Sequence, residues 1–171
     1  MSRLRSDVHC IQEYTMTTPP FVRQAHLSWL PGAYGTPPPA NSVQAASGIC
    51  IIRGRKNEDL IPGKMPIRIG AGFVPYKGEE FGLREFEVLC NTNVYANQAL
   101  YNWIPARNGE VPAGAFLAGI TGSGEPLYIA RATINDEVCV GKVNRLYKCA
   151  LLPWGNKEHK LREYEVLCCL E

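Results

Sequence analysis

The sequence of 171 residues contains no apolar run of about 18 residues, the length that a membrane-spanning helix requires. The segment that begins Met-Ser-Arg-Leu-Arg-Ser-Asp also lacks the apolar stretch of a secretory leader. We therefore expect a cytoplasmic protein without a membrane span.

The sequence also lacks a charge of one dominant sign. Its 18 lysines and arginines are balanced by 16 aspartates and glutamates, and the basic residues are scattered along the chain. Proteins that bind nucleic acid usually carry a basic patch or stripe. We therefore expect no nucleic-acid partner.

Metal-binding patterns are missing as well. The sequence has no Cys-x-x-Cys pair, and its three histidines, His9, His26 and His159, are isolated from one another and from the cysteines. The seven cysteines are an odd number, and Cys168 and Cys169 are adjacent. This usage favours reduced, partly buried thiols over a disulfide framework, and we expect neither a metal site nor a cofactor.

No constellation of catalytic residues is evident. The glycine-rich segments 70–72 and 122–124 do not continue into a phosphate-binding motif, and the cysteines lie in apolar contexts instead of beside a base. Glutamates two residues apart share one face of a strand, where we expect them to be solvated or paired with a neighbouring arginine. These glutamates are Glu85 and Glu87 beside Arg84, and Glu163 and Glu165 beside Arg162. We therefore expect no enzyme.

Helical periodicity is scarce, and strand patterns replace it. Short runs of β-branched and aromatic residues are separated by Gly, Pro and Asn, which is typical of strands and turns. The predicted strands span residues 48–53, 72–76, 85–90, 127–131, 149–154 and 163–168.

The strongest feature of the sequence is an internal repeat. The segment Leu83–Cys90 reads LREFEVLC, and Leu161–Cys168 reads LREYEVLC, at an offset of 78 residues. Earlier in each copy, Trp29-Leu30-Pro31 recurs as Trp103-Ile104-Pro105 at an offset of 74 residues. The change of offset places a longer loop, around residues 121–126, in the second copy.

The repeat predicts the organisation of the chain. We expect an N-terminal arm at residues 1–26, a first repeat at 27–90, a linker at 91–100 and a second repeat at 101–171. A β unit of this size buries too little surface to be stable alone. We therefore expect one compact all-β domain in which two tandem repeats pack their apolar faces with pseudo-twofold symmetry.

Several segments resemble the DM-nine repeat family over roughly residues 28–169. The segments that carry the resemblance are Trp103-Ile104-Pro105, Pro126-Leu127-Tyr128-Ile129-Ala130-Arg131-Ala132, Gly141-Lys142, Leu151-Leu152-Pro153-Trp154-Gly155 and Glu163-Tyr164-Glu165-Val166-Leu167. The resemblance implies an interlocked all-β fold with pseudo-twofold symmetry. It also implies kinship with mannose-binding lectins of innate immunity and with the N-terminal part of natterin-like toxins.

The resemblance further implies ligand-binding positions. In the lectins of this family, sugar recognition depends on the lysine of a Pro-Gly-Lys turn and on an aspartate in a separate loop. The lysine positions correspond to Lys64, in Pro62-Gly63-Lys64, and to Lys142, in Val140-Gly141-Lys142. The aspartate position falls near Thr121.

The residues themselves add one observation to these positions. Asp59 precedes Lys64 by the same distance at which Glu137 precedes Lys142. A carboxylate and an ammonium group presented together can accept hydrogen bonds from, and donate them to, the hydroxyls of a sugar. The alternative is that Gly-Lys forms an exposed turn with a solvated lysine and an ion pair of little energetic value.

The sequence is compatible with two functions. The first is a carbohydrate-binding lectin or pattern-recognition protein with a mannose-type glycan as its ligand, and with shallow sites at Asp59, Lys64, Thr121, Glu137 and Lys142. The second is a cytoplasmic protein-interaction or dimerisation module that has lost sugar binding. For either function we expect a homodimer.

Overall fold

The computed structural model describes residues 26–93 and 100–170, which form strands and turns without any helix. The first repeat contains β1 (Leu27–Ala33), β2 (Gln44–Ala46), β3 (Ile49–Lys56), β4 (Asp59–Pro66), β5 (Gly72–Tyr76), β6 (Glu79–Leu83) and β7 (Glu85–Asn91). The second contains β8 (Tyr101–Arg107), β9 (Leu117–Ile120), β10 (Pro126–Ile134), β11 (Glu137–Val143), β12 (Ala150–Trp154), β13 (Lys157–Leu161) and β14 (Glu163–Cys169).

Some sequence predictions fall outside the described residues. These are residues 1–25 of the predicted N-terminal arm, with His9 and Cys10, and residues 94–99 of the predicted linker. Within the described part of the chain, no helix is long and apolar enough to cross a membrane.

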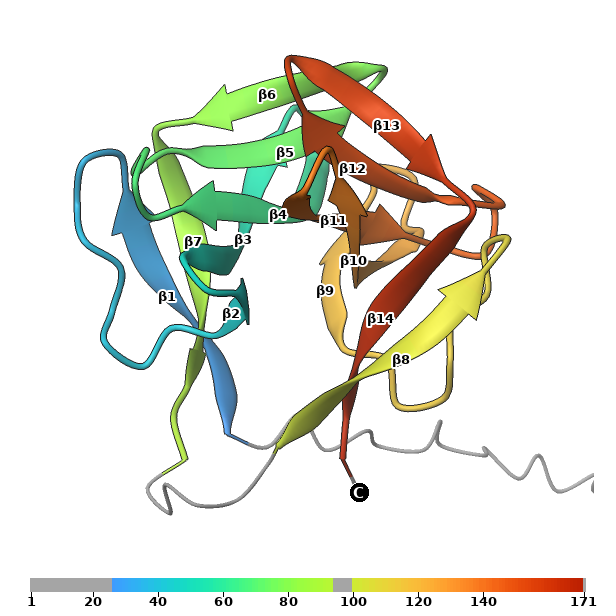
Figure 1. Cartoon of the computed structure of the whole chain (residues 1–171), viewed down its shortest axis with the longest axis horizontal. Coiled ribbons are helices and arrows are strands. Elements are labelled where there is room, and N and C mark those ends of the chain that lie inside the picture. The colour runs from blue at the N-terminus through green and yellow to red at the C-terminus, as the bar shows by residue number, and fades with distance from the viewer. Residues whose placement is uncertain (1–25, 94–99, 171) are drawn as a thin grey trace, which may run out of the picture.

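The strand order confirms an all-β fold with pseudo-twofold symmetry. The sheet runs β1-β7-β3-β4-β5-β6 through the first repeat and continues β13-β12-β11-β10-β14-β8 through the second, so that the second half repeats the first in reverse order. Figure 1 shows the two halves facing each other, with β6 and β13 adjoining where Glu79 pairs with Lys157. The short strand β2 pairs with β3, and the short strand β9 pairs with β10.

All six predicted strands exist, as β3, β5, β7, β10, β12 and β14. The predicted turn at Pro62-Gly63-Lys64 is wrong, because these residues lie inside β4. Gly63 is needed there: a Cβ atom would overlap the backbone carbonyl oxygen of Phe73 in β5. Gly141 in β11 has the same relation to the carbonyl oxygen of Leu151 in β12. Each glycine thus permits a close approach of two strands.

The core consists of three clusters, because the central strands are buried on both faces. On β3, Ile49 and Ile51 face a cluster that includes residues of both repeats, whereas Cys50 and Ile52 face a cluster made mostly of the first repeat. A third cluster belongs to the second repeat. The alternation follows the two-residue period of a strand. The shared cluster is the one that neither repeat can complete alone.

The cysteines fit this core. Six cysteines in the described residues are free, and five of these are buried: Cys50, Cys90, Cys139, Cys149 and Cys168. They behave as small apolar side chains of the strands on which they lie.

Arg53 on β3 connects the first repeat to the second. Its Nε donates to Glu87 Oε2 at 2.6 Å within the repeat, and its Nη1 donates to the carbonyl oxygen of Ala118 on β9 at 3.1 Å. Its guanidinium lies 4.4 Å from the ring centroid of Trp29. One side chain therefore joins three strands and crosses the boundary between the repeats.

Arg131 on β10 makes the same contacts in the opposite direction. Its Nε donates to Glu165 Oε2 at 2.8 Å, and its guanidinium lies 4.2 Å from the ring of Trp103. Its Nη1 donates to the carbonyl oxygen of Ala45 on β2 of the first repeat. The two repeats thus exchange equivalent hydrogen bonds.

The expected pairing of Glu87 with Arg84, and of Glu165 with Arg162, is therefore wrong. Each of the two glutamates lies directly opposite an arginine of the adjacent strand in the sheet, and that arginine contacts it. The guanidinium of Arg84 lies instead near the ring of Tyr34, at 5.4 Å.

Candidate functional site

Both predicted lysines lie on inner strands and are nearly inaccessible to solvent. Lys64 on β4 and Lys142 on β11 are each 3% exposed. An ammonium group is almost never buried to this degree without partners. The alternative of a solvated lysine in an exposed turn is therefore wrong at both positions, and the partners of the lysines define two candidate sites.

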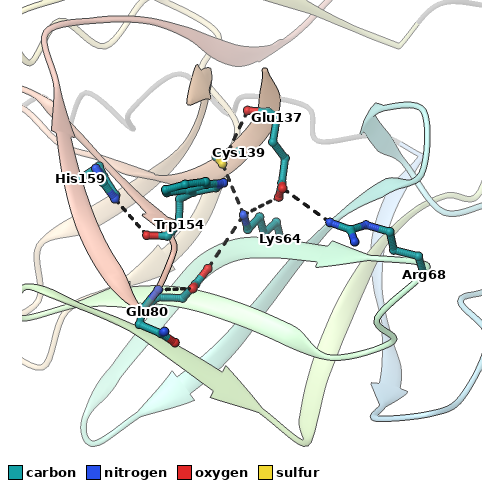
Figure 2. Close-up of polar contacts among 8 residues, drawn as sticks. Lys64, Arg68, Glu80, Glu137, Cys139, Trp154 and His159 are labelled. Carbon is teal, nitrogen blue, oxygen red and sulfur yellow. Dashed lines mark hydrogen bonds and ion pairs between the residues drawn. The ribbon is translucent and has the colours of Figure 1, made fainter. Parts of the chain in front are cut away.

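The first site, the Lys64 cluster, consists of Lys64, Arg68, Glu80, Glu137 and Cys139 (Figure 2). Lys64 Nζ donates to Glu137 Oε1 at 2.8 Å and to Cys139 Sγ at 3.3 Å, and it lies 3.9 Å from Glu80 Oε1. Arg68 Nη2 lies 3.7 Å from the other oxygen of Glu137. Glu137 and Cys139 belong to the second repeat, so this cluster crosses the boundary between the repeats.

Burial governs the thiol of the Lys64 cluster. Desolvation raises the pKa of Cys139, and the positive charge of Lys64 opposes this effect only in part. The thiol is therefore neutral near pH 7, and its sulfur accepts one of the hydrogen bonds that the ammonium group can donate.

The second site, the Lys142 cluster, consists of Lys142, Glu158, Asp59, Tyr76 and Tyr147. Lys142 Nζ lies 3.5 Å from Glu158 Oε2, and it lies 5.7 and 5.8 Å from the ring centroids of Tyr76 and Tyr147. Burial lowers the pKa of Lys142, and the charges of Glu158 and Asp59 oppose this shift. Burial also raises the pKa of Tyr147, and Asp59 and Glu158 raise it further. Asp59 and Tyr76 come from the first repeat.

The loop of residues 121–125 borders the Lys142 cluster. The backbone N–H of Gly122 donates to Asp59 Oδ1 at 2.8 Å, which fixes the position of that carboxylate. The hydroxyl of Thr121 is used inside the loop: it accepts from the backbone N–H of Glu125 at 3.0 Å and lies 3.0 Å from Ser123 Oγ. Thr121 therefore supports the loop that holds Asp59.

The predicted lysines and acidic residues are matched between the repeats and not within one strand. The sequence spacing suggested pairs of Asp59 with Lys64 and of Glu137 with Lys142, whereas Lys64 contacts Glu137, and Lys142 is influenced by Asp59. Residues five apart on a strand point to opposite faces and lie about 16 Å apart. A same-strand pair could therefore never form, and Glu137 and Asp59 act on the lysine of the other repeat.

Two acidic residues of the clusters were not predicted from the sequence. Glu80 on β6 and Glu158 on β13 each approach the lysine of their own repeat. Their separation of 78 residues equals the repeat offset, and this is the signal that could have identified them.

Trp154 and His159 have packing roles, and their ring centroids lie 5.9 Å apart. Trp154 occupies the repeat position equivalent to Tyr76 and packs against the core cluster that contains Cys139. Its carbonyl oxygen accepts a hydrogen bond from His159 Nε2 at 2.9 Å, as Figure 2 shows. No group of three or more His, Cys, Asp or Glu side chains within residues 26–93 and 100–170 is arranged to hold a metal ion.

A cavity of about 390 Å³ lies elsewhere, beside β8 and β14, and contains neither lysine. The hydroxyl of Tyr164 in its wall donates to the carbonyl oxygen of Glu110 at 3.0 Å. The cavity is lined by Pro105, Ala106, Arg107, Glu110, Glu163 and Tyr164. Because it holds none of the residues that the repeats bring together, we assign the candidate sites to the lysine clusters.

Comparisons with known proteins agree with the repeat architecture. The family described as the DM9 repeat matches residues 42–161. The chain is also similar in fold to the nematode sperm cell motility protein MFP2B, with a TM-score of 0.63 and 16% identity over 85% of this chain. The match spans 45% of the MFP2B chain, so this chain corresponds to less than half of that protein. No curated protein matches the sequence at a significant level.

Proposed function

The chain belongs to the DM9 repeat family, and from this premise we propose that it is a lectin that binds a mannose-type glycan at the boundary between its repeats. The observation that carries the proposal is the meeting of each predicted lysine with carboxylates of both repeats. Charged side chains that the strands do not need for their own pairing therefore lie together at two equivalent positions.

The chemistry of these places suits a sugar. A lysine ammonium donates hydrogen bonds to hydroxyl oxygens, and a carboxylate accepts them from hydroxyl protons. At the Lys142 cluster the rings of Tyr76 and Tyr147 add apolar surface beside the polar groups. Small-molecule sites commonly combine apolar walls with a few convergent polar groups.

The cost of burying the lysines also supports a functional role. A buried ion pair is often no more stabilising than well-packed apolar side chains of similar volume. A fold of this kind could therefore place two apolar residues at these positions without loss of stability. Retention of both lysines is accounted for if at least one of them binds a ligand.

A glycan array with the purified 171-residue chain tests the proposal. We expect selective binding to mannose-type glycans that is lost in Lys64→Ala, in Lys142→Ala or in both. Lys160→Ala, at an exposed position, is the matched control and should bind as the unmodified protein does. If no glycan binds at millimolar concentration the proposed function is wrong, and if selective binding survives both substitutions the site assignment is wrong.

A second candidate function is a cytoplasmic protein-interaction or dimerisation module. The observation that favours it is the similarity in fold to MFP2B, a protein named for sperm cell motility. Sedimentation equilibrium over a range of protein concentrations tests this candidate, since a dimerisation module should form a homodimer. A monomer at every concentration, together with glycan binding, would contradict it.

A further inference from the structure

The Lys64 cluster contains a contact between a nitrogen and a sulfur that glycan binding does not use. Lys64 Nζ lies 3.3 Å from Cys139 Sγ, and the exposed fractions of the two residues are 3% and 0%. Lys64 belongs to β4 of the first repeat and Cys139 to β11 of the second. Figure 2 shows the ammonium group and the thiol next to each other. The fold therefore holds an amine and a thiol of different repeats side by side.

This arrangement distinguishes Cys139 from the other thiols. Among the described residues, it is the only cysteine whose sulfur lies within hydrogen-bonding distance of a side-chain nitrogen. The sulfur of Cys50 contacts the hydroxyl of Ser42, and other hydrogen-bonded thiols donate to backbone carbonyl oxygens. The residue of the first repeat that corresponds to Cys139 is Ile61, so the Lys142 cluster has no thiol at this position. Chemistry between an amine and a thiol is therefore open to one of the two clusters.

The surroundings of the pair supply a proton acceptor and a way in for a small oxidant. Glu137 Oε1 accepts a hydrogen bond from Lys64 Nζ at 2.8 Å, so it is placed to take a proton from the ammonium group. The side chain of Glu137 is 25% exposed and that of the neighbouring Arg68 is 75% exposed, so the pair lies directly beneath the surface. Dioxygen is a small apolar molecule, and an apolar interior is a favourable environment for it. Burial therefore excludes charged reagents more strongly than it excludes dioxygen.

We propose that Lys64 and Cys139 are an oxidative modification site, at which dioxygen joins Nζ to Sγ through one oxygen atom. The ammonium group first gives a proton to Glu137. One N–H bond and the S–H bond then break, and an N–O bond and an O–S bond form. The nitrogen and the sulfur each lose two electrons, and dioxygen takes up all four. One of its oxygen atoms becomes the bridge, and the other leaves as water with the two hydrogens.

The geometry favours a bridging oxygen over a direct bond. A direct N–S bond would require Nζ and Sγ to come much closer than 3.3 Å, and it would draw Lys64 away from Glu137. An oxygen between them requires a smaller movement. The bridge fastens β4 to β11 across the boundary between the repeats, at residues 75 positions apart in the chain. The inference goes beyond the proposed function and does not depend on glycan binding.

Mass spectrometry of the 171-residue chain, kept in air-saturated buffer or under argon with a reductant, tests this inference. We expect a gain of about 14 Da in air only, from one added oxygen and two lost hydrogens. Tryptic digestion without prior reduction should then yield residues 57–68, uncleaved after Lys64, linked to residues 132–142. Excess dithiothreitol should separate the two peptides. Two molecules of it supply the four electrons that restore the amine and the thiol and release water.

Two cysteine variants assign the modification to the proposed pair. Cys139→Ser keeps a hydrogen-bonding group beside Lys64 but has no sulfur, so the gain in mass should disappear. Cys149→Ser is the matched control, because Cys149 is also buried but its thiol donates to the carbonyl oxygen of Tyr147. This variant should gain the same mass as the unmodified chain. If Cys139→Ser does not fold, the linked peptides of the unmodified chain still decide the matter.

Several outcomes would overturn the inference. These are an unchanged mass in air, a gain of about 16 or 32 Da on Cys139 alone, which indicates a sulfenic or sulfinic acid, and a loss of about 2 Da, which indicates a direct bond without oxygen. A gain that survives dithiothreitol, or that persists in Cys139→Ser, would also overturn it. None of these outcomes bears on glycan binding. An array on which no glycan binds would reject the proposed function and leave this inference standing.

Discussion

Arg131, on β10 of the second repeat, donates a hydrogen bond to the backbone carbonyl oxygen of Ala45, on β2 of the first repeat. The equivalent residue of the first repeat, Arg53, returns the contact to the carbonyl oxygen of Ala118. Each repeat thus satisfies a backbone group of the other, in addition to sharing an apolar core. The two repeats are interlocked, and several measurable properties follow.

Replacing Arg131 should destabilise the whole domain. Arg131→Ala leaves the carbonyl oxygen of Ala45 and the carboxylate of Glu165 without their donor, and it removes packing from Trp103. We expect a loss of about 1–3 kcal/mol in the free energy of unfolding. Urea unfolding measures the loss. Arg162→Ala, at an exposed position, is the control and should cost less than about 0.5 kcal/mol.

The second repeat should not fold by itself. A fragment of residues 92–171 lacks Ala45, the partner of Arg131, and lacks the first-repeat side of the shared core cluster. It also exposes the edge of β13, which pairs with β6 in the whole chain. We expect no cooperative thermal transition for the monomeric fragment by circular dichroism. A cooperatively melting monomer would show that the repeats are independent.

The close approach of β11 and β12 should depend on Gly141. In Gly141→Ala, the added Cβ atom overlaps the backbone carbonyl oxygen of Leu151, and a backbone atom in a sheet cannot move aside cheaply. We expect destabilisation of about 3 kcal/mol, measured by chemical unfolding. The control is Gly82→Ala on β6, where the nearest atom lies 3.9 Å from the added Cβ atom. Equal effects of the two substitutions would contradict this explanation.

Stability should fall in mildly alkaline solution. Burial raises the pKa of five buried thiols above the ordinary value of 9.0. Below pH 9 these thiols are neutral in both states. Above it the unfolded chain loses its thiol protons first, so stability is lost as the pH rises from 9.0 toward the raised values. The lowered pKa of Lys142 acts in the opposite direction but involves one group.

Urea unfolding under reducing conditions between about pH 7 and pH 10 measures this dependence. The double variant Cys50→Ala with Cys168→Ala should show a shallower fall above pH 9, because two of the thiols no longer ionise in the unfolded chain. A stability that is constant across this range would contradict the assignment of the thiols to the core.

The repeat made much of the fold predictable. The near-identity of Leu83–Cys90 and Leu161–Cys168 indicated two equivalent β units, and strands rich in β-branched residues were identified within a few positions. The strands β1, β4, β8 and β11 were not predicted, and each of them contains Pro or Gly. Pro31 and Pro105 lie on β1 and β8, the two ends of the sheet order, where a missing N–H is tolerated. Gly63 looked like a turn residue but serves a close strand contact.

The two lysines of the candidate site were predicted from the sequence, whereas Glu80, Glu158 and the pairing of lysines with carboxylates were not. Lys64 and Lys142 were recognised from their positions in the two copies. Which carboxylate each lysine meets depends on how the two repeats are placed against each other, and local sequence carries no such information. The face of the strand on which each side chain lies could have excluded the pair of Asp59 and Lys64. Residues at an odd spacing along a strand point to opposite faces.

The reverse strand order of the two halves has an evolutionary consequence. If one repeat assembled with a copy of itself in this arrangement, it would make the arginine-to-carbonyl contact twice, and any substitution would act at both places at once. Fusion of the two repeats into one polypeptide allows the residues at the two contacts to change independently. Arg68 and Leu146, at corresponding positions, show how far they have diverged: Arg68 lies beside the half-buried Glu137, whereas Leu146 is an exposed apolar side chain.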